Sequence, residues 1–164
     1  MKMKIVFIKE RRSSVMDPRV YEWLARLQKN GYRLTESRRA VIEILAHSER
    51  TLNPTEVYDL ARQRYDSLGL VTVYRTLAKL EELGLIQQVH QPDGCEAYIA
   101  AVSGHQHLLI CKACNKVEYF QGDKLDGLVE RVENESGFLV QEHWLQLFGW
   151  CSKCQQNGTQ VSRS

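Results

Sequence analysis

The chain lacks any long hydrophobic run. No apolar stretch approaches the roughly 20 residues that a helix needs to cross a bilayer, so no membrane span is expected. The apolar stretch at residues 5–8 is shorter than a signal-peptide core, and no small-residue cleavage site follows it. We therefore expect a protein that stays in the cytoplasm and has no membrane partner.

The motifs of zinc enzymes are also missing. A zinc-dependent protease carries H-E-x-x-H on a helix, and a zinc deaminase places a glutamate beside its histidine ligand. The histidine pair of this chain reads His105-Gln106-His107 instead, and H-E-x-x-H does not occur. The expectation is a protein that is not an enzyme and has no small-molecule substrate.

Charge is unevenly divided along an otherwise ordinary composition. The 164 residues are 43% hydrophobic and 26% charged, which is typical of a globular chain with room for one ordinary domain or two small ones. Residues 1–90 hold 16 lysines and arginines against 11 acidic residues, whereas residues 91–164 hold 6 against 9. A basic first half joined to an acidic second half fits a nucleic-acid-binding domain that carries a different module.

Residues 17–101 are expected to form a winged-helix DNA-binding domain, after an N-terminal extension at 1–16. Apolar residues recur at helical spacing in four segments before Gly84, and the expected helix caps are Asp17, Thr35, Asn53 and Thr72. The pattern then changes to strand, turn and strand over 85–101, which predicts a β-hairpin wing that also serves as the hinge. In a winged helix the last helix enters the major groove of DNA.

The outer face of the fourth expected helix has the chemistry to bind DNA. Thr72, Arg75 and Lys79 share the face opposite the core by their spacing, and Tyr74 lies at its edge. Hydroxyl, guanidinium and ammonium groups of this kind bind phosphates and base edges. We therefore expect double-stranded DNA as a partner.

Residues 102–154 are expected to form a small α/β domain, followed by a polar tail at 155–164. The predicted order is strand (105–111), strand (116–121), helix (123–135) and strand (138–148). The helix is expected to turn four apolar residues inward, namely Leu125, Leu128, Val129 and Val132. The fold class of the whole chain is therefore predicted as α+β.

Two CxxC pairs predict a structural zinc site. One tight turn can aim both sulfurs of a pair at the same tetrahedral ion, so two pairs complete a four-sulfur site. Disulfides are disfavoured in a cytoplasmic chain, and four thiolates leave no open position for catalysis. The expected ligands of the structural Zn²⁺ are Cys111, Cys114, Cys151 and Cys154.

The histidines predict a second metal site. His105 and His107 lie on the same side of a strand, because side chains alternate along it. The further candidate ligands nearby or later in the chain are His90, Cys95 and His143. A set of imidazoles with a thiolate suits Zn²⁺.

The chain resembles the ferric uptake regulator family over residues 17–154. The resemblance rests on residues 33–38 (RLTESR), 72–77 (TVYRTL) and 84–86 (GLI), on the HxH strand that runs into CxxC, and on His143, Gly149 and Cys151 in this order. It implies a homodimer that binds an inverted-repeat operator when its sensing site holds metal, and that usually represses transcription. It also implies that Tyr74 and Arg75 face the DNA, with Arg33 near the DNA backbone.

The resemblance leaves two assignments of the second site open. The commonest sensing histidines of the family lie five and three residues before the first cysteine of the first CxxC pair. His105 and His107 lie six and four residues before Cys111. Counted without a gap, the pair matches the family's inter-strand site, whose implied partners are Asp126 and His143. A one-residue bulge at 108–109 would instead turn the pair toward the hinge, with His90 and Cys95.

Zinc is the predicted metal of the sensing site. Iron and peroxide sensors of this family usually carry a histidine just before the third helix, and residues 50–52 have none. Zinc sensors often use a cysteine near the wing, where Cys95 lies. We therefore expect a zinc-responsive repressor of zinc-uptake genes, with a second, regulatory Zn²⁺ in each subunit. One alternative is an iron- or peroxide-responsive regulator. Another is a protein-interaction adaptor that is stabilised by structural zinc and does not bind DNA.

Overall fold

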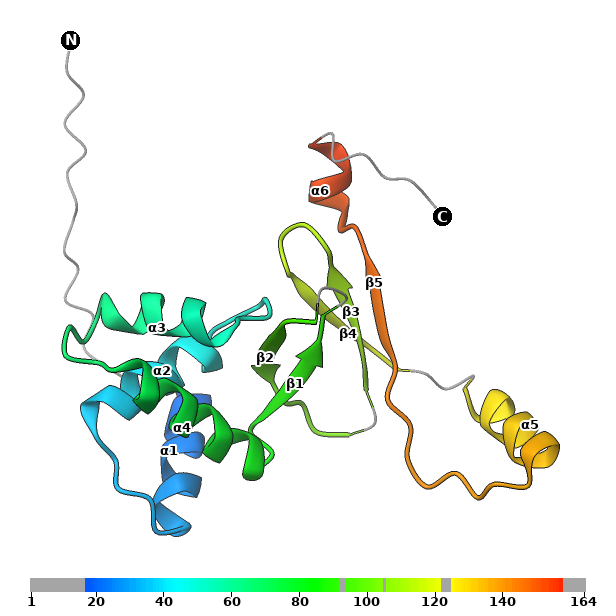
Figure 1. Ribbon diagram of the computed structural model, residues 1–164, viewed down its shortest axis with the longest axis horizontal. Helices are drawn as coiled ribbons and strands as arrows, with labels where there is room; N and C mark the ends of the chain where they lie inside the picture. Colours follow the sequence, from blue (N-terminus) through cyan, green and yellow to red (C-terminus); the bar gives the residue numbers. More distant parts are fainter. Residues whose placement is uncertain (1–16, 92–93, 105, 122–124, 158–164) are drawn as a thin grey trace.

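The computed structural model has a helical N-terminal part and a strand-rich C-terminal part (Figure 1). It describes residues 17–91, 94–104, 106–121 and 125–157. The expected extension at 1–16, the turn residues Pro92 and Asp93, His105 and the end of the expected tail lie outside the described residues.

Four helices form the N-terminal part, and three of them begin at the expected caps. The side chains of Asp17 and Thr35 accept hydrogen bonds from the amides of Arg19 and Arg38, at 2.8 and 3.3 Å. Asn53 forms a complete capping box with the residue three positions later. No helix in the described ranges is long and apolar enough to cross a membrane. The helices are α1 (Pro18–Lys29), α2 (Glu36–Ala46), α3 (Pro54–Arg62) and α4 (Leu70–Glu82).

The expected cap of α4 is wrong. The helix begins at Leu70, so its N-cap is Gly69, and Thr72 lies inside the first turn. Glycine is an accepted N-cap, and the amide of Thr72 donates to the carbonyl of Gly69 at 2.9 Å. Three residues that the sequence pattern placed outside this helix, Leu70, Val71 and Thr72, therefore belong to it.

The hairpin wing packs against the helices. β1 (Ile86–His90) pairs antiparallel with β2 (Glu96–Ala100), in a register that sets Ile86 opposite Ala100. Leu85, Ile86 and Tyr98 are buried in the same core as the inward faces of all four helices. The predicted winged helix is therefore confirmed by the structure.

A three-stranded sheet forms the centre of the C-terminal part. Its strand order is β4-β3-β5, in which β3 pairs antiparallel with β4 and parallel with β5. Its small core consists of Val89, Ile99, Leu108, Ile110 and Val117, of which the first two belong to the wing. The elements are β3 (His107–Cys111), β4 (Val117–Phe120), α5 (Asp126–Ser136), β5 (Gln146–Gly149) and α6 (Ser152–Gln156).

Two expectations about this part are wrong. The helix α5 stands away from the sheet (Figure 1) and buries none of its residues, so Leu128 and Val132 are exposed rather than turned inward. The last strand is short, because only Gln146–Gly149 pairs with β3. Phe138 and Leu139 precede it and are 75% and 80% exposed. The apolar residues of α5 and of 138–144 therefore find no covering surface within the described part of the chain.

Candidate metal centre and DNA-binding face

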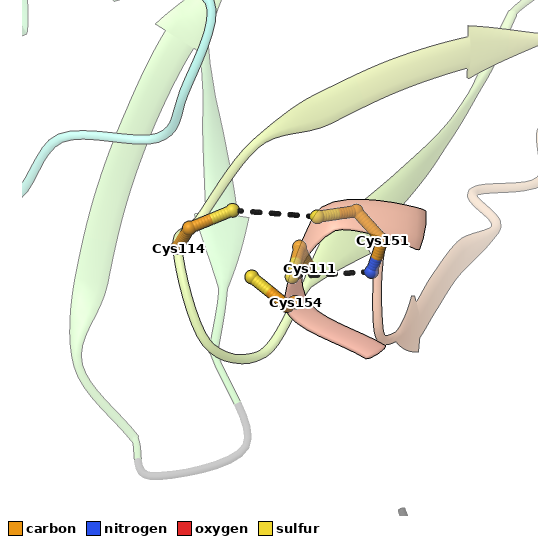
Figure 2. Close-up of side chains that lie close together, drawn as sticks. All are labelled: Cys111, Cys114, Cys151 and Cys154. Carbon is orange, nitrogen blue, oxygen red and sulfur yellow. Dashed lines mark hydrogen bonds between the residues drawn. The ribbon is translucent and has the colours of Figure 1, made fainter. Parts of the chain in front are cut away.

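The four cysteines of the CxxC pairs converge on one point (Figure 2). Their sulfur atoms all lie within 4.8 Å of one another, as the spacing predicted. Cys111 ends β3, and Cys114 lies in the turn before β4. Cys151 is the N-cap of α6, and Cys154 lies inside that helix. The parallel pairing of β5 with β3 brings the two pairs together, because it sets Gly149 beside Cys111.

The first cysteine turn is fixed by its own main chain. Asn115 has a φ of 61°, in the left-handed region that asparagine tolerates better than most residues. Its amide donates to the carbonyl of Cys111 at 2.9 Å, and the amide of Cys111 donates to the carbonyl of Lys116 at 2.9 Å. This geometry aims the sulfurs of Cys111 and Cys114 to the same side of the hairpin.

The surroundings of the sulfurs favour one thiolate and disfavour another. Burial of Cys111 opposes its ionisation, but the amides of Cys151, Cys114 and Ala113 outweigh it and lower its pKa to about 6. Hydrogen bonds with Cys151 and Cys114 raise the pKa of Cys154 to about 12. Four thiols this close cannot all ionise unless a cation neutralises them. The donor set therefore fits Zn²⁺, which binds four thiolates tetrahedrally.

The structure brings two of the predicted sensing histidines together. His107 is 2% exposed, and its ring centroid lies 5.3 Å from that of His143 and 5.4 Å from that of Phe120. Both histidines line a cleft of about 1220 Å³ between the wing and the C-terminal strands, and His90 lines it as well. His105, the remaining member of the predicted pair, lies outside the described residues.

The pairing of β3 bears on the two alternatives for this site. Residues 107–110 pair one to one with 120–117, so the strand contains no bulge at 108–109. The contact between His107 and His143 also belongs to the inter-strand set. Asp126 is exposed at the start of α5, and Cys95 is exposed before β2. Among the described residues, the four cysteines are the group of potential metal ligands found close together.

The outward face of α4 carries the residues predicted to bind DNA. Tyr74 and Arg75 are exposed, and Thr72 and Lys79 are half-buried. The ammonium group of Lys79 lies 2.6 Å from a carboxylate oxygen of Glu82 and 5.1 Å from the ring centre of Tyr32. Hydrogen bonds with Glu82 and then Tyr32 raise the pKa of Lys79. Lys79 therefore carries its positive charge at neutral pH, in the last turn of the helix.

Two further residues, outside the predicted face of α4, are also exposed. Arg33 is exposed, and its carbonyl accepts a hydrogen bond from the Arg38 guanidinium. Val71 is 63% exposed in the first turn of α4, although it is a large apolar residue. Val71 is not among the predicted DNA-facing residues, because the expected N-cap at Thr72 leaves it outside the helix. Its place directly before the TVYRTL motif is the signal that could have identified it.

Comparison with known proteins points to one family. The model of the Ferric uptake regulator family matches residues 29–148. The ferric uptake regulation protein of Bacillus subtilis is 30% identical over 149 residues, which cover 88% of this chain and all of that protein.

Solved structures agree with this match. The Helicobacter pylori ferric uptake regulator, which has three functional metal-binding sites, matches with a TM-score of 0.67 and 25% identity over 85% of this chain and 96% of its own. A zinc uptake regulator solved with zinc and DNA matches with a TM-score of 0.64 over 84% of this chain and 93% of its own. Its identity is 18%, so this last likeness concerns the fold alone.

Proposed function

The chain belongs to the ferric uptake regulator family of metal-responsive transcription regulators, and from this premise we propose that it is a zinc-responsive repressor of zinc-uptake genes. The observation that carries the proposal is the imidazole pair of His107 and His143 in the cleft between the wing and the C-terminal strands. A sensing ion must bind the DNA-competent and the incompetent shape with different affinity. The cleft is lined by residues of both the wing and the C-terminal part. Ligands in it can therefore bind the ion with a different affinity when the two parts move relative to each other.

DNA binding is assigned to the outer face of α4. Members of this family bind DNA as dimers, and a two-fold dimer reads an inverted repeat. We propose that Tyr74 and Arg75 contact base edges, and that Thr72, Lys79 and Arg33 contact the phosphate backbone. The exposed methyl groups of Val71 have the chemistry to pack on a thymine methyl.

Dimerisation is assigned to residues 102–154, with 17–101 as the DNA-binding domain and 85–101 as its hinge. The apolar side chains of α5 and of residues 138–144 are exposed in one copy of the chain. A surface of this kind is normally covered by a partner. A second copy of the chain, bound through this region, would place two recognition helices on one operator.

Two metal sites with different tasks are proposed. The four cysteines hold a structural Zn²⁺, because four thiolates bind it too tightly for it to follow the free metal. The regulatory Zn²⁺ uses the inter-strand set of His105, His107, Asp126 and His143, and the contact between His107 and His143 supports this choice. A hinge set with His90 and Cys95 is the alternative. A repressor of this kind acts on the chromosome, in the cytoplasm.

The proposed sensing site is tested by replacing His105 and His107 together with alanine. Zinc should no longer increase operator affinity, whereas metal analysis should still find the ion of the four cysteines. Asp126→Ala and Cys95→Ser then separate the two ligand sets, because each removes a ligand from one set only. A double variant that still responds fully to zinc would show that sensing takes place elsewhere.

The sensed metal is tested by titrating the same binding assay with zinc, iron(II) and manganese(II) without oxygen. Zinc should activate at the lowest free concentration. An iron- or peroxide-responsive regulator is the second candidate, and activation by iron at a lower concentration than zinc would favour it. The relatives with iron-related names make this comparison necessary.

The recognition face is tested with Arg75→Ala. The change should weaken operator binding by about 5- to 150-fold and leave the melting temperature and metal content unchanged, because it removes a contact worth roughly 1–3 kcal/mol. Arg62→Ala, an exposed arginine at the end of α3, controls for the loss of one positive charge. Equal affinities of the two variants would place the recognition face elsewhere.

A further inference from the structure

Residues 49–52, here named the bridging segment, run from the end of α2 toward the wing (Figure 1). Leu52 pairs antiparallel with Tyr98 of β2, through main-chain hydrogen bonds of 2.9 and 2.8 Å. Thr51 is completely buried beside it, and its hydroxyl accepts a hydrogen bond from the Gln91 side chain at 3.3 Å. One side of the segment is therefore held by the wing.

The other side of the bridging segment is held by the first cysteine turn. The amide of Thr51 donates to the carbonyl of Asn115 at 2.9 Å, and the amide of Val117 donates to the carbonyl of Glu49 at 3.0 Å. Asn115 directly follows Cys114, and its amide donates back to the carbonyl of Cys111. The turn that holds the bridging segment is therefore the same turn that positions the sulfurs of Cys111 and Cys114.

The bridging segment also leads directly into α3. The guanidinium of Arg50 lies 2.6 Å from one carboxylate oxygen of Glu56, whose other oxygen accepts from the amide of Asn53 at 2.9 Å. Asn53 and Glu56 form the capping box at which α3 begins. Val57 and Ala61 of α3 are buried in the core that also holds the inward face of α4. A displacement of the segment would therefore move the helical part that carries the recognition helix.

We infer that the bridging segment fixes the DNA-binding helices relative to the C-terminal sheet, and that Arg50 and Thr51 are positioning residues for binding to a two-part operator. Main-chain hydrogen bonds lie on both sides of the segment, and breaking a buried one leaves a donor or acceptor unsatisfied. The link is made of protein atoms alone and runs from the four-cysteine site to α3. It is separate from the histidine cleft, and it requires dimeric DNA binding without depending on which metal is sensed.

The link has a measurable consequence for operator geometry. In a dimer, the angle between each DNA-binding domain and the dimerising part sets the distance between the two recognition helices. A stiff link makes affinity fall steeply when the two half-sites are moved apart or together. A loosened link lowers the affinity for the best spacing, and it also lowers the penalty for a wrong spacing.

The test uses the full-length, zinc-saturated dimer with Arg50→Gln and, separately, Thr51→Pro. The first removes the ion pair with Glu56, and the second removes the amide that donates to Asn115. The probes are the tightest inverted repeat that the unmodified protein selects in vitro, the same duplex with one base pair added or removed between its half-sites, and a single half-site. Affinity for each probe is measured at one salt concentration.

Both variants should bind the single half-site as tightly as the unmodified protein and the selected operator about tenfold more weakly, within the usual range of coupling between sites. The penalty for a changed spacing should fall at least about threefold. Arg50→Lys keeps the charge and should restore the spacing preference. Arg64→Gln, which removes the 2.9 Å ion pair with Glu43 outside the segment, should leave it unchanged.

Two results would overturn the inference. One is an unchanged spacing preference in folded Arg50→Gln, which decides the matter alone if Thr51→Pro does not fold. The other is an equal loss of affinity for the half-site and for the full operator, since that pattern indicates a direct DNA contact or general instability. Either result leaves the proposed sensing function intact, because the zinc response is measured independently.

Discussion

The helical part buries most of its apolar residues within one chain, whereas the C-terminal part leaves many of its own exposed. The main core draws on all four helices and the wing, with Leu27, Val41, Ile42 and Leu45 completely buried. The C-terminal core has five buried members, of which Val89 and Ile99 come from the wing. The helical part thus has a large core of its own, whereas on the proposed function the C-terminal part depends on an ion bound by the four cysteines and on a second copy of the chain.

Cys151→Ser should have the largest effect on this difference between the two parts. Binding of structural zinc contributes about 10–16 kcal/mol in small zinc-dependent folds, so its loss should disorder the C-terminal part and dissociate the dimer. The helical part should keep its far-ultraviolet circular dichroism and melt as a separate unit. Gel filtration and thermal melting measure both effects. Cys95→Ser is the control, and a Cys151→Ser dimer of unchanged stability would contradict the structural role of the ion.

A cavity in the main core should have the next largest effect. Leu45→Ala removes a completely buried side chain in the last turn of α2 and should cost about 2–5 kcal/mol of unfolding free energy. Urea denaturation, followed by far-ultraviolet circular dichroism of the helices, measures this loss of free energy. Leu139→Ala, the same change at an exposed position, should not alter this transition. A similar loss in both variants would mean that the two parts unfold as one cooperative unit.

The exposed apolar residues of the C-terminal part should matter to association instead. Leu139→Ser should raise the dimer dissociation constant by at least about tenfold, because apolar anchors dominate interfaces of this kind. Sedimentation at several concentrations gives the constant. Tyr21→Ser, at an apolar position on α1 that is 65% exposed, is the control. If the two variants dimerise equally well, another surface forms the dimer.

The smallest effect is expected at the start of α3. Asn53→Ala removes the capping box and should cost about 1 kcal/mol of unfolding free energy. Thr55→Ala, at an exposed position two residues later, should be near neutral. Urea denaturation gives the free energy of unfolding of both variants. Equal values would show that the cap contributes nothing to stability.

Local signals in the sequence predicted the helical part well. Caps act within three residues, so Asp17, Thr35 and Asn53 mark real helix starts. The start of α4 was missed because Gly69 caps it without a side chain. The four-cysteine cluster was also predictable, since the spacing within each CxxC pair limits where its sulfurs can point.

Non-local features of the C-terminal part were not predictable. The pattern of α5 identifies its apolar face but not what covers that face, and within one chain nothing described does. The sequence could not choose between the two sets of partners for His107, because the choice depends on how β3 pairs. The regular register over residues 107–110 and the contact with His143 carry information that no local motif contains.

The parallel pairing of β3 with β5 also bears on how the chain folds during synthesis. The two cysteine pairs are separated by 36 residues, so the sheet cannot close until β5 has left the ribosome, and the four sulfurs cannot meet until the second pair has followed it. Contacts of such long range form slowly, because loop closure must precede them. The helices and wing are complete by residue 101, so they can fold while the rest is still being made. A chain arrested before α5 would therefore present the folded helices and wing without the residues that we propose to form the dimer.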